Sequence, residues 1–450
     1  MNDLKKRVDA FIRRLEREDV CMHGFMLSKG GRLLAKAYYC PFKEGEPHRL
    51  YSVSKTMTAL AIGLLLDEGR LKLNDRIADY FKDWLNEKPD PRFLRLKIED
   101  MLCMSSCFMR TAFNSARDFN FAKGAVCATP THEPGSVFYY DTGASQLLAE
   151  LVYRLTGKQA IDLLNERVFA PLGLKDERYW LADPSGTCQG GSGLCMSLRD
   201  MHRVAEAIMN GGEGVLPKWF CEQMCQKHIE TVLNQNEEER YGYCWQCWRT
   251  RAGWAMYGMG GQLAVCCPDK GCILSTIADT RLDPFGVQRI YNAFFEEIYP
   301  YIDKEDMECE SYSLSIAPLK DDPTIPFEHT QTYVFNENGM GIKALRLTNE
   351  GLEITGASGT SVLEFTFGQN TLTRFPGTGR AALCSAGRLS ENLLRIRCFI
   401  IDDAPCGIDM VLAFKENSLT LSSRKSFDPD TDRYEGVISS IAVMPRRGVT

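Results

Sequence analysis

One stretch carries most of the information about the fold of this chain: Leu50-Tyr51-Ser52-Val53-Ser54-Lys55-Thr56-Met57-Thr58. It leads into the apolar run Ala59-Leu60-Ala61-Ile62-Gly63-Leu64-Leu65-Leu66, and together they predict a buried helix that begins near Ser52. A serine in the first turn and a lysine three residues later lie on one face of such a helix. The hydroxyl is then at the positive end of the helix dipole beside an amine, which can turn a weak alcohol into a nucleophile.

The spacing Ser-x-x-Lys also arises by chance. The alternative is that Ser52 only caps the helix and Lys55 is a solvated surface residue. The context favours chemistry, because the helix is followed by Asp67-Glu68-Gly69-Arg70-Leu71-Lys72-Leu73-Asn74-Asp75. A Ser-x-x-Lys helix, an acidic turn ending in glycine and a Leu-x-Leu-x-Asp segment, in this order, resemble the serine β-lactamase and penicillin-binding-protein family. Within that family the order is most similar to the bacterial branch of class C β-lactamases, esterases and D-aminopeptidases.

The predicted elements agree with the fold that this resemblance implies. Residues 23–39 are expected to form two strands around the turn Lys29-Gly30-Gly31, and residues 285–301 a long amphipathic helix. Helical patterns dominate from about residue 56 to residue 210. Terminal helices on an antiparallel sheet, with a helical subdomain inserted between early and late strands, predict an α+β, β-lactamase-like fold over about residues 20–300.

A second motif of the family is a tyrosine followed two residues later by asparagine, on a loop that faces the serine. The segment Pro134-Gly135-Ser136-Val137-Phe138-Tyr139-Tyr140-Asp141-Thr142-Gly143 matches its surroundings and selects Tyr140, with Thr142 at the asparagine position. The alternative is that Tyr140 is an ordinary half-buried tyrosine. A hydroxyl lacks the paired donor and acceptor of an amide, so Thr142 changes how a substrate amide is bound. We expect Lys55 and Tyr140 to shuttle the proton of Ser52 to the leaving group.

The third motif of the family is Lys-Thr-Gly or His-x-Gly, on a strand that lines the site. The corresponding residues here are Gly258, Met259, Gly260 and Gly261, ahead of the apolar segment Leu263-Ala264-Val265. Their backbone N–H groups are expected to bind substrate and to form half of an oxyanion hole, with Ser52 N–H as the other half. The alternative is a tight glycine hairpin without chemistry. Because no Lys or His is present here, we expect weak or no β-lactamase activity.

Composition limits the other classes of function. The chain has 450 residues, 44% hydrophobic and 25% charged, and its net charge of −6 argues against a nucleic-acid partner. Charged residues interrupt the N-terminus before an apolar run develops, so we expect no signal peptide. The longest apolar run, residues 59–66, is far shorter than the ~18 residues of a membrane span. These features predict a cytoplasmic protein without a membrane partner.

Eighteen cysteines are expected to be reduced and mostly buried, as is usual without export signals. Cys244 and Cys247 lie in residues 241–248, which we predict to be a strand, so they point to opposite faces. Cys221 and Cys225 are four apart on a predicted helix near His228, where zinc is a weaker alternative to buried thiols. We therefore expect no metal and no cofactor.

The chain changes character after about residue 300. Residues 303–313 are acidic and polar and are predicted to be a linker that follows a hydrolase domain over residues 1–302. Short alternating segments such as Thr332-Tyr333-Val334-Phe335, separated by turn signals, predict an all-β barrel or sandwich over residues 314–450.

Together these features predict a serine hydrolase that forms an acyl-enzyme at Ser52 and cleaves a small ester, amide or peptide. The alternative is a catalytically silent binding or sensor protein that keeps the fold. Thr142 and the altered third motif favour this alternative, whereas the intact Ser52, Lys55 and Tyr140 favour the enzyme.

Overall fold

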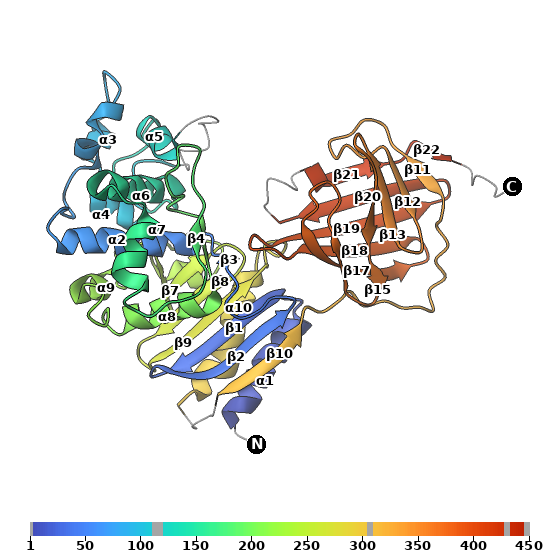
Figure 1. Cartoon of the computed structure of the whole chain (residues 1–450), viewed down its shortest axis with the longest axis horizontal. Coiled ribbons are helices and arrows are strands. Elements are labelled where there is room, and N and C mark those ends of the chain that lie inside the picture. Colours follow the sequence, from blue (N-terminus) through green and yellow to red (C-terminus); the bar gives the residue numbers. More distant parts are fainter. Residues whose placement is uncertain (1–2, 110–119, 304–308, 427–432, 445–450) are drawn as a thin grey trace. The chain divides into compact units, whose positions relative to one another are not determined.

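The computed structural model describes residues 3–109, 120–303, 309–426 and 433–444. It divides the chain into two compact units, which are coloured along the sequence in Figure 1. Unit 1 comprises Met1–Ala278 and Phe285–Leu314, and unit 2 comprises Asp279–Pro284 and Ser315–Thr450. Of the described part of the chain, no helix is both long enough and apolar enough to cross a membrane.

Unit 1 is built on one seven-stranded sheet (Figure 1). Across the sheet the strands are β10 (Glu310–Ser315), β2 (Arg32–Cys40), β1 (Met22–Lys29), β9 (Cys272–Ala278), β8 (Gln262–Cys267), β7 (Gly253–Gly258) and β6 (Trp248–Thr250). From β2 to β6 every neighbouring pair is antiparallel. The hairpin β1–β2 around Gly30 and Gly31 confirms the predicted early strands.

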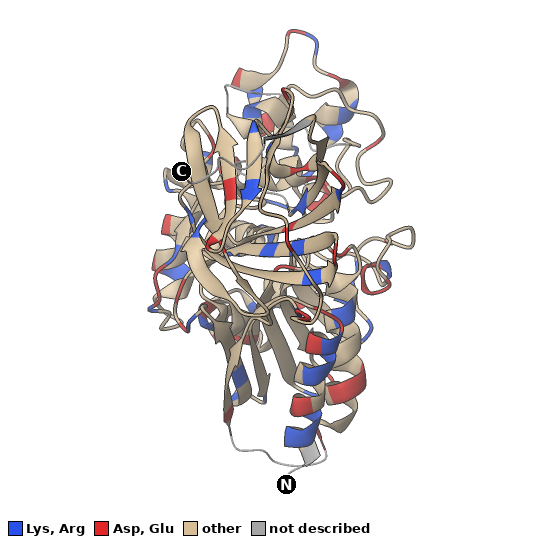
Figure 2. Ribbon diagram, turned by 90° about the vertical axis from the view of Figure 1, so that its right-hand side faces the viewer, with Lys and Arg blue, Asp and Glu red and all other residues tan. Residues whose placement is uncertain are grey.

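Helices cover both faces of this sheet. Phe25 on β1 contacts Phe11 of α1 (Asp3–Arg17), with ring centroids 5.4 Å apart. Ser28, which points to the other face, forms a 2.8 Å hydrogen bond with His202 of α8 (Leu198–Met209). Helix α1 also packs on α10 (Gly286–Ala293), and charges of both signs lie along it near the N-terminus in Figure 2. The predicted α+β class is confirmed.

A helical region separates the early strands from the late ones. Its helices are α2 (Val53–Asp67), α3 (Pro91–Arg95), α4 (Ile98–Leu102), α5 (Phe121–Val126), α6 (Thr142–Thr156), α7 (Ala160–Leu164) and α9 (Lys218–Met224). A small sheet has the order β3 (His48–Arg49), β5 (Leu194–Met196) and β4 (Tyr179–Trp180). Helix α2 is apolar on all sides and packs against α6, α7 and β7, so it is buried from its first turn to its last.

Unit 2 contains strands and, over its described residues, no α-helix. One sheet has the order β14 (Gly359–Glu364), β13 (Gly351–Gly356), β12 (Ala344–Leu347), β11 (Thr332–Val334) and β22 (Ala442–Met444). The other has the order β15 (Thr366–Phe367), β17 (Ala381–Ser390), β18 (Leu393–Ile400), β19 (Cys406–Lys415), β20 (Ser418–Lys425) and β21 (Gly436–Ser439), with β16 (Thr371–Arg374) paired to β17. Both sheets contribute to one apolar core, and each ends in edge strands, so the described residues form a sandwich and not a closed barrel.

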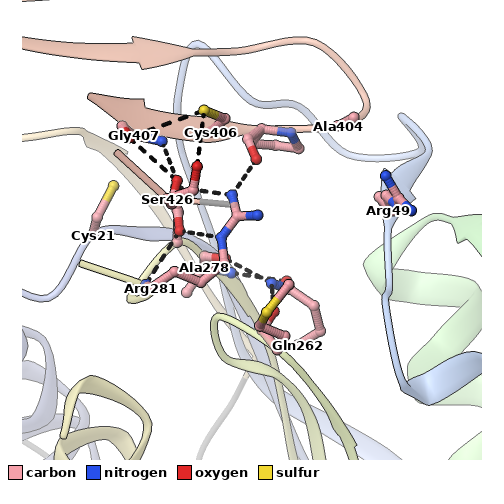
Figure 3. Close-up of polar contacts among 12 residues, drawn as sticks. Cys21, Arg49, Gln262, Ala278, Arg281, Ala404, Cys406, Gly407 and Ser426 are labelled. Atoms are coloured by element: carbon pink, nitrogen blue, oxygen red, sulfur yellow. Dashed lines mark hydrogen bonds and ion pairs between the residues drawn. The ribbon is translucent and has the colours of Figure 1, made fainter. Parts of the chain in front are cut away.

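The boundary between the units differs in detail from the sequence-based division. Residues 310–315, most of which we predicted to be linker, form edge strand β10 of the unit 1 sheet. Asp279–Pro284, which follows β9, groups with unit 2. The buried Asp279 carboxylate forms an ion pair with Arg281 at 2.7 Å and accepts a 3.0 Å hydrogen bond from Ser426 Oγ. Arg281 also donates a hydrogen bond to Pro405 O (Figure 3). A buried ion pair is stable only when further hydrogen bonds satisfy its charged atoms, and here Pro405 and Ser426 supply them. Both residues are more than 120 positions away in sequence.

The strand predicted at residues 241–248 is wrong. Only Trp248–Thr250 forms a strand, β6, and Cys244 N donates to Cys247 O at 2.9 Å across a turn. Gln246 has a φ of 57°, and its side chain donates to Met101 O at 2.8 Å and accepts from Ser145 Oγ at 2.6 Å. These contacts with distant helices outweigh the local strand propensity.

Candidate active site

Ser52 lies at the turn that leads from β3 into α2. It is the N-cap residue, with φ −71° and ψ −5°, but its side chain makes no capping hydrogen bond. The turn is fixed instead by Ser54, whose Oγ donates to Tyr51 O at 2.6 Å and accepts from Leu194 N at 2.9 Å. Tyr51 has a φ of 47°, a costly conformation for a bulky residue. The structure therefore gives no support to a purely capping role for the Ser52 hydroxyl.

Lys55 lies one turn further along α2 and is only 1% exposed, so it is not a solvated surface residue. Its Nζ donates to Ser52 Oγ at 3.1 Å, to Thr142 Oγ1 at 3.2 Å and to Gly191 O at 2.6 Å. Burial lowers the pKa of Lys55 to about 7, although the nearby Asp141 carboxylate acts to raise it. At neutral pH much of the amine is therefore uncharged. A neutral amine has only two N–H groups for these three partners, so its lone pair can accept a hydrogen bond from one of the two hydroxyls, Ser52 or Thr142.

The hydroxyl of Tyr140 lies beside the side chain of Ser52, and the Tyr140 ring centroid lies 4.9 Å from Lys55 Nζ. The ring stacks on Trp248 at 5.7 Å and meets Tyr243 edge-on at 6.2 Å. Burial raises the pKa of Tyr140 above its ordinary value, so the phenol is protonated at neutral pH. Its neighbour Tyr139 is exposed. The structure thus brings together Ser52, Lys55 and Tyr140.

The residues between Tyr140 and the next helix also belong to this cluster. Thr142 begins α6 and accepts a hydrogen bond from Lys55. Asp141 is the N-cap of α6: its carboxylate accepts from Gly143 N at 2.9 Å and from Ser106 Oγ at 3.1 Å. Burial raises the pKa of Asp141 to about 6, while these hydrogen bonds and Lys55 act to lower it. The sequence analysis did not include Asp141, although an acidic residue ahead of a helix is a recognisable N-cap signal.

A glycine loop on the other side of Lys55 was also missed. Gly191 O accepts the shortest of the three Lys55 hydrogen bonds, and Gly190 O accepts from Thr58 Oγ1 at 2.8 Å. A Cβ at Gly191 would lie 2.5 Å from Thr142 Cγ2 and 3.1 Å from Lys55 Nζ. The glycines of Gln189-Gly190-Gly191-Ser192-Gly193 therefore let this backbone approach the lysine closely, and their density in the sequence was the available signal.

The glycine hairpin joins β7 to β8 beside the turn before Ser52. A Cβ at Gly258 would lie 2.1 Å from Leu50 O, so only glycine allows this approach. Gly260 and Gly261 have φ values of 90° and 97°, as tight turns require. Met259 is at the exposed tip, and Gln262 holds the hairpin through Nε2, which donates to Met259 O at 3.0 Å and to Ala278 O at 2.7 Å (Figure 3).

One cationic side chain near Ser52, that of Arg49, was not predicted from the third motif. Arg49 on β3 lies close to the serine turn, as its guanidinium carbon is 5.0 Å from the ring centroid of Tyr51. Its Nε donates to Ser192 O at 3.4 Å, next to the glycine that binds Lys55. Within the described residues, no group of three or more His, Cys, Asp or Glu side chains is placed to hold a metal ion.

The sequence of this chain is similar to those of known proteins. The Beta-lactamase family model matches residues 12–294. The 6-aminohexanoate-dimer hydrolase of Paenarthrobacter ureafaciens is 25% identical over 226 residues, which are 46% of this chain and 58% of that protein. The D-alanyl-D-alanine-carboxypeptidase/endopeptidase AmpH of Escherichia coli K12 is 28% identical over 145 residues, 29% of this chain and 36% of that protein. The chain thus spans little more than half, or less, of the curated relatives it matches.

A solved structure shows the same fold. The D-amino acid amidase of Ochrobactrum anthropi SV3 superposes with a TM-score of 0.54 at 16% identity, over 68% of this chain and 100% of that one. An antiparallel sheet between helices, with a serine and a buried lysine at the start of α2 and a tyrosine just ahead of α6, defines the β-lactamase-like class. The family model covers well over half of the chain, and the chain belongs to the Beta-lactamase family.

Proposed function

We propose that this chain is a serine hydrolase that forms an acyl-enzyme at Ser52 and cleaves a small ester, amide or peptide. One observation carries the proposal: Lys55 Nζ is buried 3.1 Å from Ser52 Oγ, and its pKa is lowered to about 7. A buried amine without such a role would be a cost to stability. The names of the relatives, a dimer hydrolase, a carboxypeptidase and an amidase, favour an amide or peptide as the substrate.

The protonation states suggest how the proton moves. Neutral Lys55 takes the proton of Ser52 as Oγ forms a bond to the substrate carbonyl carbon. The bond from this carbon to the leaving nitrogen or oxygen then breaks, and Tyr140 gives its phenolic proton to the leaving atom. Lys55 returns a proton to Tyr140, and water releases the acyl group by the same steps in reverse. The buried Asp141 carboxylate stabilises the transient ammonium.

The glycine hairpin and Thr142 are proposed to bind the substrate. The developing oxyanion would receive hydrogen bonds from Ser52 N–H and from one N–H of the hairpin. Gly261 N–H already donates to Gly258 O at 3.3 Å, so Met259 and Gly260 are the candidates for this second donor. Residues 254–262 contain no Lys, Arg or His, and we propose that β-lactamase activity is weak or absent.

Within the family we propose the branch of class C β-lactamases, esterases and D-aminopeptidases, since the order of motifs is similar to theirs. We also propose a cytoplasmic location. The cysteines form no disulfide in the part of the chain that the structure describes, and most of them are buried, which is usual in a reducing compartment.

The test uses a fluorophosphonate and a short-chain p-nitrophenyl ester. We expect the wild-type protein to gain one adduct by intact mass and to hydrolyse the ester, and Ser52→Ala to lose both. The fold should survive this change, because the Ser52 side chain makes no capping bond. Ser192→Ala, at a second half-buried serine beside Gly191, is the matched control and should keep the adduct. Labelling without turnover would favour the silent alternative, and no labelling of the wild type would refute the proposal.

A further inference from the structure

A cavity of about 860 Å³ opens beside Tyr140. Residues 136–140 and residues 227–234 form its walls. Tyr140 therefore belongs both to this cavity and to the cluster with Ser52 and Lys55. A volume of this size is typical of pockets that enclose small organic ligands.

Both walls are anchored to the body of unit 1. Tyr139 N donates to Met104 O at 2.8 Å, and Tyr243 N donates to Ile229 O at 2.9 Å. Behind them, Met104 and Tyr243 pack in one apolar cluster with Trp248, against which the ring of Tyr140 lies. The cavity is therefore formed before any ligand binds, which reduces the entropic cost of binding.

The polar side chains of the second wall are engaged within the protein. Lys227 Nζ donates to Glu230 Oε1 at 2.7 Å, which pairs the two charges of this wall. His228 forms a 2.8 Å hydrogen bond with a backbone carbonyl and stacks on Trp245 at 4.7 Å. Thr231 Oγ1 donates to Glu239 O at 2.6 Å. Lys227 and Glu230 remain 45% and 63% exposed, but because the two charges are paired with each other they add no net charge to the wall.

Besides this ion pair, three aliphatic side chains of the two walls are exposed. Leu233 is 96% exposed, Val232 is 63% exposed, and Val137 on the opposite wall is 51% exposed. Contact with an apolar ligand would remove this surface from water, which is favourable in proportion to the area covered. The chemistry of the cavity thus fits an uncharged, apolar group.

We propose that this cavity binds the apolar part of the substrate's leaving group, a straight-chain alkyl or a ring carried by the alcohol or amine that is released. This inference rests on the proposed function, in which Tyr140 gives its proton to the leaving atom. That atom must then lie within hydrogen-bonding distance of the Tyr140 hydroxyl, and the group attached to it extends along the side of Tyr140 where the cavity opens. The acyl part lies on the side of Ser52 and the glycine hairpin.

Isomeric esters separate the two ends of the substrate. Hexyl acetate and ethyl hexanoate have the same composition, but the long chain is on the leaving group in the first and on the acyl group in the second. Full burial of one methylene is worth about a fourfold gain in affinity. A cavity that captures half of this free energy over four additional methylenes should give hexyl acetate a kcat/KM about 15-fold higher, measured by acid release in a pH-stat.

The variant Leu233→Ser should remove most of this preference and leave ethyl acetate hydrolysis unchanged. Leu389→Ser, at an exposed leucine of β17, is the matched control and should keep the preference. Equal or faster hydrolysis of ethyl hexanoate, or an unchanged preference in Leu233→Ser, would overturn the assignment.

A binding measurement keeps the failure of the cavity distinct from the failure of the proposed function. Saturation-transfer NMR with 1-hexanol and the Ser52→Ala protein should show binding that weakens at least several-fold when Leu233→Ser is added. If no ester is hydrolysed but hexanol binds in this way, the proposed function and the leaving-group role fail together, whereas the cavity is still shown to bind an apolar alkyl group. Absence of hexanol binding to Ser52→Ala overturns the cavity assignment.

Discussion

The lowered pKa of Lys55 has a consequence for stability that needs no substrate. A lysine whose pKa is about 7 in the folded protein and 10.5 in the unfolded chain binds a proton more weakly when folded. Below pH 7 the folded state therefore bears the full cost of this amine, and the cost disappears as the pH rises from about 7 to 10.5. The variant Lys55→Met replaces the amine by an apolar group of similar length, and its unfolding free energy therefore lacks this pH-dependent cost.

The size of the effect follows from the two pKa values. Linkage gives a cost of about 4 kcal/mol at pH 7 and about 2 kcal/mol at pH 9. The unfolding free energy of the wild type should therefore rise relative to that of Lys55→Met by about 2 kcal/mol between these pH values. The hydrogen bonds to Gly191 and Thr142 are lost in the variant at every pH. Their loss shifts the difference in unfolding free energy by a constant amount and leaves its dependence on pH unchanged.

The assay is urea unfolding followed by tryptophan fluorescence at pH 7, 8 and 9. All six tryptophans lie in residues 84–254, so the signal reports on unit 1 alone. Lys72→Met, at an exposed lysine of the same unit, is the matched control and should give a curve parallel to the wild type. Parallel curves for Lys55→Met would show that burial does not lower the pKa of Lys55, and the proposed role of this residue as a base would then be refuted.

Three further changes test the neighbouring groups. Tyr140→Phe should lower kcat/KM by about 10²- to 10⁴-fold, because the leaving group loses its proton donor; near-normal turnover would remove Tyr140 from the mechanism. Asp141→Asn removes the charge that raises the pKa of Lys55. Because activity needs the neutral amine, the acid limb of the pH profile of kcat/KM should move to lower pH in Asp141→Asn. The control Ser106→Ala keeps the charge of Asp141 and should not move the limb in this direction. An unmoved limb in Asp141→Asn would contradict the electrostatic effect of Asp141 on Lys55. Gly191→Ala forces a Cβ to within 2.5 Å of Thr142 Cγ2 and should reduce both turnover and the thermal midpoint of unit 1, and wild-type values for both would show that the loop can move aside.

Local patterns were enough to predict the elements whose sequence signal is strong. Leu4, Val8, Phe11 and Leu15 recur at helical spacing, which is a local signal for α1, and all four are buried. The strands β1 and β2 follow from two short strand-like segments on either side of the turn at Gly30, which are local properties. The prediction at residues 241–248 failed because Gln246 is held by partners on α4 and α6 that are far away in sequence.

The candidate site shows the same division. Ser52, Lys55 and Tyr140 could be chosen from motifs because each motif is a short run of the chain with a fixed spacing. The partners Asp141 and Gly191 could not be assigned in this way, because their importance depends on which atoms meet Lys55 in space.

The sequence by itself determined the α+β class, the central helix and the type of nucleophile, since helix periodicity and the Ser-x-x-Lys spacing are encoded within a few turns. Only the tertiary structure decided that Lys55 is buried among Ser52, Thr142 and Gly191, because burial is a property of the three segments packed together. The same is true of the cavity beside Tyr140, whose two walls are about 90 residues apart in the chain. The pKa of the base and the room for a substrate both depend on solvent exclusion, and solvent is excluded only when distant segments come into contact.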